Sequence, residues 1–77
     1  MFSQSEENYL KAIYSLEREF ADSVSTNLIA EMLSTKASSV TDMIKKLAQK
    51  KLVIYQKYKG VKLSNSGKKI ALSVIRK

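Results

Sequence analysis

The spacing of apolar residues changes twice along this chain, and the order of the changes limits the folds it can adopt. Up to about residue 50 the apolar residues recur every three or four positions, as on one face of an α-helix. The segment from Leu52 to Tyr58 is rich in β-branched and aromatic residues and alternates toward its end, which is typical of a strand. Helical spacing returns from Ile70 onward. Because 77 residues leave room for one core, the pattern predicts a single α+β, mainly α, domain over 1–77.

Three helices are predicted before the strands, at about 5–20, 26–33 and 37–50. Residues that can cap a helix stand at the start of each one. The candidate caps are Ser3 with Glu6 for the first helix, Ser25 or Thr26 for the second, and Lys36 or Ser38 for the third. The second and third helices are separated by only a short polar turn, and Ala30 is small enough to let them cross closely.

A hairpin and a last helix complete the pattern. Residues 52–58 and 61–63 are predicted to pair as antiparallel strands, with the turn at Lys59-Gly60 because glycine tolerates a positive φ. The last helix is predicted from about residue 65, and the chain ends within it. We therefore expect these residues to be a fragment of a longer protein. The order of elements is that of a winged helix-turn-helix.

The basic side chains are concentrated in the second half of the chain. Residues 1–35 hold two basic and six acidic side chains, a net charge of −4, whereas residues 36–77 hold twelve basic side chains and one acid, a net charge of +11. Such asymmetry in a small domain favours binding to a polyanion, most often a nucleic acid. The alternative is that the charge only keeps the domain in solution.

Several classes of function are disfavoured by what the composition lacks. The chain has no cysteine and no histidine, which excludes disulfides and thiolate metal sites and removes the commonest general base. No apolar run approaches the roughly 18 residues of a membrane span, and no signal peptide is recognisable. We expect no enzyme, no catalytic residues, no membrane contact and a cytoplasmic location.

The first half of the third helix presents small polar side chains outward once its apolar residues pack inward. These side chains are Ser38, Ser39, Thr41 and Asp42. Small hydroxyl groups let a helix approach base edges and phosphates closely, and the first amides of a helix bind phosphate. Alternatively the two serines are only caps, and Asp42 either accepts from a cytosine amine or pairs with Lys45 or Lys46.

Lysines continue this polar surface into the hairpin. The candidate phosphate contacts are Lys45, Lys46, Lys50 and Lys51 in and just after the third helix, and Lys57, Lys59 and Lys62 in the hairpin. The alternative is a solvated charged face. Tyr55 and Tyr58 are interpreted as cross-strand packing in preference to base stacking, and Met32 and Met43 as core residues.

Three segments resemble a known family, the DtxR/MntR-type metal-dependent repressors. Residues 5–14, SEENYLKAIY, resemble the opening helix of that family. Residues 29–33, IAEML, and 38–47, SSVTDMIKKL, resemble its helix-turn-helix. Residues 63–71, LSNSGKKIA, resemble the exit from its wing and the start of the next helix.

The resemblance implies a bacterial transcription regulator whose N-terminal domain binds double-stranded operator DNA. It assigns recognition-helix positions to Lys36, Ser38, Ser39, Thr41 and Asp42, a phosphate contact to Thr26, and the wing to Lys57–Lys62. The full-length protein is expected to be a homodimer that spans two half-sites, and a monomer of these residues would bind one half-site weakly. Iron or manganese is the cofactor that the resemblance implies for the full-length protein.

Two residues depart from the family pattern at its metal site. Family members place a carboxylate or methionine ligand where this chain has Asn8, and manganese-type members add a carboxylate where it has Lys11. An asparagine oxygen can bind a hard cation weakly, but a protonated ammonium cannot act as a ligand. No metal or cofactor site is therefore predicted within these residues.

Two other functions use the same charge pattern. A basic RNA-binding module would use the same lysines, but it usually stacks bases on exposed aromatic rings, and the tyrosines are expected to be buried. A winged-helix protein–protein adaptor would need an exposed apolar patch and would not bind DNA in a salt-dependent way.

Overall fold

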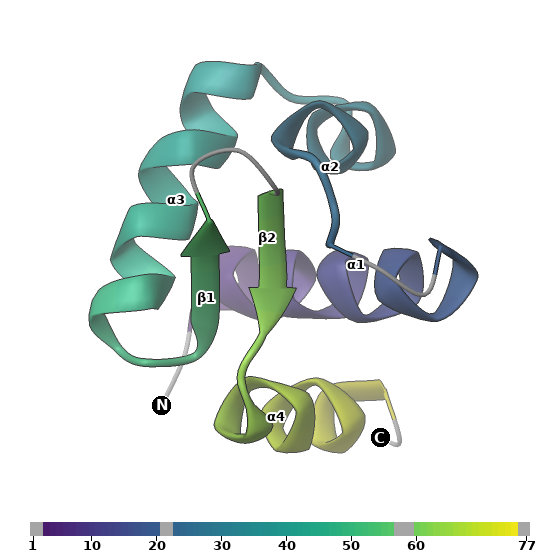
Figure 1. Ribbon diagram of the computed structural model, residues 1–77, viewed down its shortest axis with the longest axis vertical. Coiled ribbons are helices and arrows are strands. Elements are labelled where there is room, and N and C mark those ends of the chain that lie inside the picture. Colours follow the sequence, from purple (N-terminus) through teal and green to yellow (C-terminus); the bar gives the residue numbers. More distant parts are fainter. Residues whose placement is uncertain (1–2, 21–22, 57–59, 76–77) are drawn as a thin grey trace.

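Helix α1 (Gln4–Phe20) crosses the middle of the molecule, with α4 (Asn65–Ile75) along one side and α2 (Thr26–Leu33) on the other (Figure 1). Helix α3 (Ala37–Gln49) follows α2, and strands β1 (Val53–Gln56) and β2 (Gly60–Leu63) form a two-stranded antiparallel sheet. The computed structural model describes residues 3–20, 23–56 and 60–75. The predicted winged helix-turn-helix is confirmed, and the predicted first three helices agree with α1–α3 to within one residue at each end.

The helix starts show which of the predicted caps are used. The capping box before α1 is present: the Glu6 amide donates to Ser3 Oγ at 3.2 Å, and the Ser3 amide donates to Glu6 Oε1 at 3.3 Å. Ser25 Oγ accepts from the Leu28 amide at 3.1 Å, so Ser25 is the cap of α2. Lys36 is the N-cap residue of α3 and makes no side-chain cap hydrogen bond, which leaves Ser38 inside the helix.

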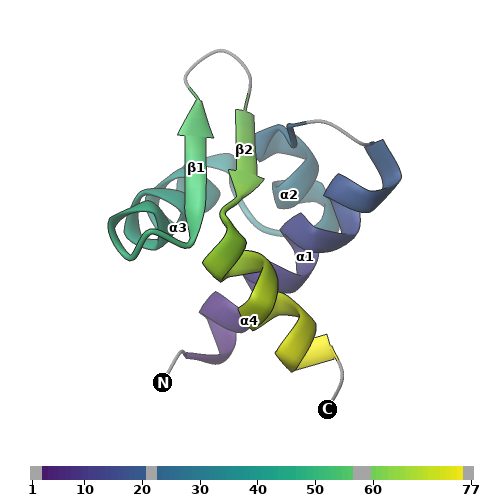
Figure 2. The same ribbon diagram turned by 60° about the horizontal axis from the view of Figure 1, so that its bottom comes forward.

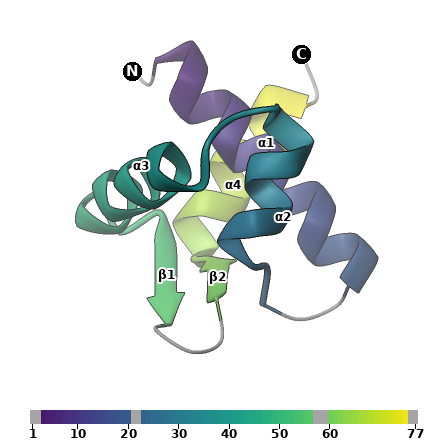
Figure 3. The ribbon, with the colours of Figure 1, turned by 90° about the horizontal axis from the view of Figure 1, so that it is seen from above.

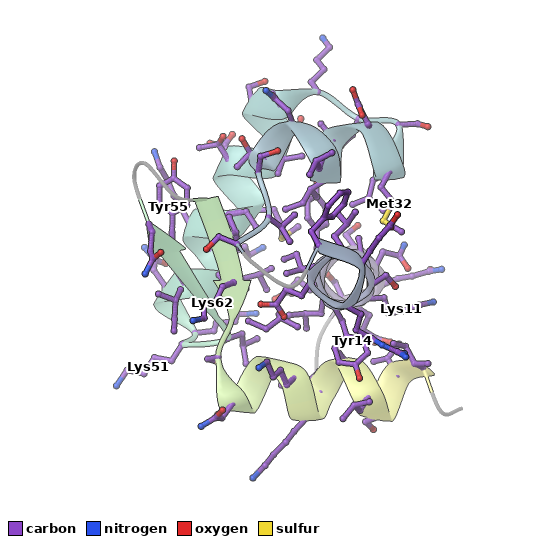
Figure 4. The ribbon with its side chains drawn as sticks, turned by 45° about the vertical axis from the view of Figure 1, so that its right-hand side comes forward. Lys11, Tyr14, Met32, Lys51, Tyr55 and Lys62 are labelled. Carbon is purple, nitrogen blue, oxygen red and sulfur yellow. The ribbon has the colours of Figure 1, made fainter. Side chains whose placement is uncertain are left out.

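The core lies around the apolar stripe of α1. Leu10 and Ile13 are fully buried there, against side chains of α2, α3, the sheet and α4. The largest fully buried side chains are Leu10, Ile13, Val24, Ile29, Val40, Ile44, Leu47 and Val61. Met43 packs partly against this core, as predicted. Met32 is 50% exposed, so its predicted core role is wrong; it lies at the surface where α2 adjoins α1 (Figure 4).

A third segment pairs with the hairpin and ties it to the helix-turn-helix. The strand register places Val53 opposite Leu63 and Tyr55 opposite Val61. On the other edge of β2, Val24 and Val61 exchange two backbone hydrogen bonds of 2.8 and 2.7 Å. Gly60 has a φ of 105°, and a Cβ there would lie 2.5 Å from the Val24 carbonyl oxygen. Glycine is therefore required by conformation and by space where β2 begins.

Two carboxylates of α1 make long-range contacts. Glu17 Oε1 accepts from the Leu63 amide at 2.9 Å, which fixes the end of β2 against α1. Glu6, only 4% exposed, accepts from the ammonium of Lys50 at the end of α3.

The two strands lie at the end of the molecule away from both termini (Figure 2). No described helix is both long and apolar enough to cross a membrane.

Gly67 is buried in the first turn of α4, where the helix meets the chain before β1. A Cβ on Gly67 would lie 2.0 Å from the Leu52 carbonyl oxygen, which is backbone and has little freedom to move. Gly67→Ala is expected to destabilise the domain by about 1–3 kcal/mol in denaturant unfolding, because the clash outweighs the gain in helix propensity. Ser66→Ala, at the exposed neighbouring position, is the matched control and should change stability by less than about 0.5 kcal/mol. An increase in stability for Gly67→Ala would contradict the close approach of α4.

The Glu6 carboxylate should make stability depend on pH in the acid range. The Lys50 ammonium is the main cause that lowers the pKa of Glu6 below its ordinary value of 4.5, with help from the Ser3 hydrogen bonds and against the effect of burial. A lowered folded-state pKa means that the stabilisation is complete above pH 4.5 and is lost as the pH falls through the folded-state pKa. In unfolding measurements from pH 7 to pH 3, wild type is expected to lose its advantage over Glu6→Gln at the acid end. A difference that stays constant across this range would contradict the pairing.

Candidate nucleic-acid interface

Helix α3 has one buried face and one exposed polar face. Val40, Ile44 and Leu47 are fully buried against the rest of the domain. The side chains of Ser38, Ser39, Asp42, Lys45, Lys46 and Gln49 are exposed. Positions 38, 42, 45 and 49 are spaced by four, three and four residues, so they form one stripe along the helix. Of these we use Ser38, Asp42 and Lys45, together with the exposed Ser39 beside Ser38, and we call these four residues the α3 stripe.

The exposed groups of the α3 stripe are not used as helix caps. Ser38 and Ser39 are the second and third residues of α3, and Lys36 holds the N-cap position, so the interpretation of both serines as simple caps is wrong. The Lys36 side chain makes no cap hydrogen bond, so it leaves the first amides of α3 open on this side. Thr41 is half-buried, and its Oγ1 donates to the Ala37 carbonyl at 3.1 Å. Thr41 is therefore satisfied within the helix, unlike the stripe beside it.

Asp42 does not pair with its lysine neighbours. The ion pair found in the described part of the chain joins Lys50 to Glu6, and none joins Asp42 to Lys45 or Lys46. Of the two interpretations of Asp42, the local pair is therefore not seen, and the exposed carboxylate is open to a ligand that donates hydrogen bonds.

The residues around the start of α3 share one face of the molecule. Figure 3 looks onto this face, where α2 and the turn into α3 lie in front and the hairpin lies at the edge. Thr26 is the half-buried first residue of α2, and Lys36 is exposed at the start of α3. Lys36 thus adjoins the α3 stripe directly, while Thr26 begins the helix that packs against it.

Lys62 does not lie beside the α3 stripe. It is exposed on β2 and lines a hollow of about 500 Å³ together with Arg18 of α1 and Lys68 of α4. Its neighbours are therefore on the α1 and α4 side of the sheet (Figure 4). The other predicted wing contacts, Lys57 and Lys59, lie outside the described residues.

Tyr55, for which cross-strand packing was predicted, is a candidate nucleic-acid contact. It is 42% exposed on β1, the strand that packs against α3, so the predicted burial is wrong (Figure 4). Its partner across the sheet, Val61, is fully buried. Tyr55 lies two residues after Val53, close to the turn of the hairpin, and this position could have indicated its exposure. Tyr58 lies outside the described residues.

The charge, the exposed stripe and the fold agree with a comparison to known families. Residues 1–61 match the family model described as "Iron dependent repressor, N-terminal DNA binding domain". The chain belongs to this family. Two relatives, the HTH-type transcriptional regulators MntR of Bacillus subtilis strain 168 and of Bacillus velezensis, are each 39% identical to it over 75 residues. The alignment covers 97% of this chain and 52% of either relative, so the chain spans about half their length.

Solved structures show the same fold. The hypothetical protein SSo2273 from Sulfolobus solfataricus aligns with a TM-score of 0.81 and 28% identity, over 91% of this chain and 53% of that one. ScaR with bound Zn²⁺ aligns with a TM-score of 0.77 and 31% identity, over 92% of this chain and 32% of that one. MepR, a transcription regulator of Staphylococcus aureus, shares the fold at a TM-score of 0.81 and 23% identity, with 97% and 56% covered. The two MntR relatives are named as transcriptional regulators, which agrees with the expectation that the chain is not an enzyme.

The family implies a metal, and the residues of this domain do not fit one. Asn8 and Lys11 are exposed on α1 and line a hollow with Met32 of α2. Across 3–20, 23–56 and 60–75, no three acidic, histidine or cysteine side chains converge on a point that could hold a metal ion. A protonated ammonium repels a cation and has no lone pair to donate, so Lys11 opposes metal binding in this hollow.

We expect manganese to leave these residues unchanged. Adding about 1 mM Mn²⁺ in place of EDTA should move the thermal midpoint by less than about 1 °C, because an ion that does not bind the folded state cannot stabilise it. The double variant Asn8→Asp with Lys11→Glu places two carboxylate groups on the same face of α1. It is measured with and without Mn²⁺ in the same way, for comparison with wild type. A saturable rise in the wild-type midpoint would contradict the absence of a site among the described residues.

Proposed function

We propose that this domain binds double-stranded operator DNA in a sequence-specific way, with α3 in the major groove. The observation that carries the proposal is the α3 stripe, whose side chains are exposed and polar. The stripe lies on the second helix of the helix-turn-helix, and the chain belongs to a family of DNA-binding domains. Ser38 and Ser39 let the start of α3 approach closely, and Asp42 accepts from an exposed cytosine amine. These three residues are the proposed base-reading set.

Phosphate contacts surround the reading residues. Lys36 and Lys45 are exposed at the start and in the middle of α3, where they can face the backbone on either side of the groove. Thr26 supplies a hydroxyl group at the edge of the same surface, whereas the Thr41 hydroxyl donates to the Ala37 carbonyl and would have to release it to contact a phosphate. Lys57, Lys59 and Lys62 are the proposed wing contacts. Lys62 shares its hollow with Arg18 of α1 and Lys68 of α4.

The complete protein is proposed to be a cytoplasmic bacterial repressor that acts as a homodimer on two half-sites. The two MntR relatives extend well beyond the length aligned here, which leaves room for a dimerisation region. Iron or manganese would then bind ligands outside the described residues, because Asn8 and Lys11 do not supply them. A monomer of these 77 residues would bind one half-site weakly.

Salt-dependent binding to duplex DNA tests the proposal directly. Fluorescence anisotropy on a random-sequence duplex pool, titrated from about 50 to 300 mM salt, should give a steep slope of about 0.9 per phosphate contact. A single-stranded RNA competitor should displace the duplex poorly. Stronger binding to the RNA would favour the RNA-binding module, for which the exposed Tyr55 offers a stacking surface. No binding to either at low salt would favour the adaptor.

Lys45→Ala should weaken duplex binding on every sequence and reduce the salt slope by about 0.9, because one phosphate contact is lost. Lys11→Ala is the matched control: it removes the same charge from an exposed position on α1, away from the α3 stripe. Equal losses in the two variants would mean that net charge, not contact at α3, determines the affinity.

Asp42→Ala should change the preferred sequence. Selection from a random duplex pool, followed by anisotropy on the wild-type winner and on its single-base variants, should reveal a position where discrimination falls by about 1–3 kcal/mol. At other positions discrimination should be retained. A uniform change on all duplexes would remove Asp42 from the base-reading set.

A further inference from the structure

Glu6 is the buried charged side chain of the described chain, and capping α1 does not require it to be buried. Its exposure is 4%, whereas Ser3, with which it forms the capping box, is exposed. A capping carboxylate can remain in water at no desolvation cost, but a buried one must be paired. The partner is the Lys50 ammonium, which donates to Glu6 Oε2 at 2.5 Å, 44 residues away in sequence.

Lys50 comes from the other end of a different helix. It is the C-cap residue of α3, and its backbone amide donates to the Lys46 and Leu47 carbonyls of the last turn. The N-terminal end of a helix favours a negative charge and the C-terminal end a positive one. Glu6 in the first turn of α1 and Lys50 at the end of α3 each satisfy this preference. Their ion pair therefore joins two helix ends that both stabilise it.

The pair adds a polar contact between α3 and α1, two helices that also share the apolar core. Helix α3 packs mainly against α2 and β1, while α1 packs mainly against α4, α2 and β2. The start of α3 is held by the turn from α2, where the Thr35 amide donates to the Ala30 carbonyl at 2.9 Å. The far end of α3 is held to α1 through Lys50 and Glu6. Base contacts need hydrogen-bond distances of about 3 Å, so the direction of α3 must be closely fixed.

We propose that the Glu6–Lys50 ion pair is a positioning contact that sets the orientation of α3 on α1 for DNA reading. The proposal rests on the DNA-binding function proposed above. The pair also distinguishes Lys50 from the other lysines of α3, because the Lys50 ammonium donates to the Glu6 carboxylate of the same domain. Glu6 and Lys50 are positioning residues, because they act through the α3 stripe and need not touch DNA.

The charge change gives a way to tell positioning from simple electrostatics. Glu6→Gln removes a negative charge and keeps an oxygen for the cap, so electrostatics alone predicts tighter binding to DNA. Positioning predicts the opposite for a preferred duplex, with affinity about three- to tenfold weaker, and little change or a gain on random duplex. Lys50→Met should lose a similar factor on the preferred duplex, and the double variant should lose little more than either single variant because the two act as one unit.

The orientation of α3 can be measured without DNA. Residual dipolar couplings of the amides of α1 and α3 in the 77-residue chain should fit one rigid arrangement in wild type. In Glu6→Gln and Lys50→Met the α3 couplings should change relative to those of α1. Lys50→Arg keeps the cation and should retain the wild-type couplings and affinity. Lys51→Met removes the same charge at the adjacent exposed position and should leave the couplings unchanged.

The two proposals fail in different ways. If wild type binds no duplex, the proposed function fails, and the couplings still decide whether the pair orients α3. If wild type binds and Glu6→Gln keeps both the α3 couplings and the preferred-duplex affinity, the positioning proposal is overturned. Circular dichroism establishes that each variant is folded under the conditions used. Should Lys50→Met be unfolded, Glu6→Gln with its intact cap carries the comparison.

Discussion

Burial of the apolar face of α1 is the constraint on which the other elements depend. Leu10 and Ile13 are fully buried, and α2, α4 and β2 all pack against this one helix. Each such side chain contributes about 1.5–3 kcal/mol on burial, which is a large share of the stability available to a domain of 77 residues. Helix α3 is different. It reaches the core through Val40, Ile44 and Leu47 and keeps a whole face free.

Polar contacts then orient what the core holds in place. The two hydrogen bonds between Val24 and Val61 attach the hairpin to the segment before α2, and the Leu63 amide is held by Glu17 of α1. Besides the buried side chains of Val53, Val61 and Leu63, these contacts fix the hairpin at two further points. Gly60 permits the close approach of Val24, because any side chain there would meet the Val24 carbonyl. A wing fixed in this way keeps a constant relation to α3.

Local signals made most of the fold predictable. The capping box at Ser3, the cap at Ser25 and the change of apolar spacing near Lys51 each depend on neighbours in sequence, and the structure confirms the elements they predict. The features missed are those decided by distant residues. The bridge from Val24 to Val61 and the pair from Glu6 to Lys50 join positions tens of residues apart, and no pattern in the sequence marks them.

Exposure was the harder property to infer for single side chains. Met32 and Tyr55 have apolar character and fall within apolar runs. Each side chain is nevertheless about half exposed, Met32 on α2 and Tyr55 on β1. The α3 stripe was easier, because three apolar positions on the opposite face fix which side of the helix is buried. Helical periodicity constrains a whole face, whereas the end of a short strand has no such repeat.

The surface proposed to read DNA and the surface where the resemblance would place a metal ligand are separate in this domain. The α3 stripe lies on the face with the α2–α3 turn, whereas Asn8 and Lys11 lie on α1 beside Met32. Residues on one surface can therefore change without altering the other, provided that the core of α1 is kept. This chain keeps the polar face of α3 and has the Lys11 ammonium where the resemblance would place a ligand. The contact of the domain itself that we propose to orient α3 is the Glu6–Lys50 pair, in which Glu6 is buried and Lys50 is partly exposed.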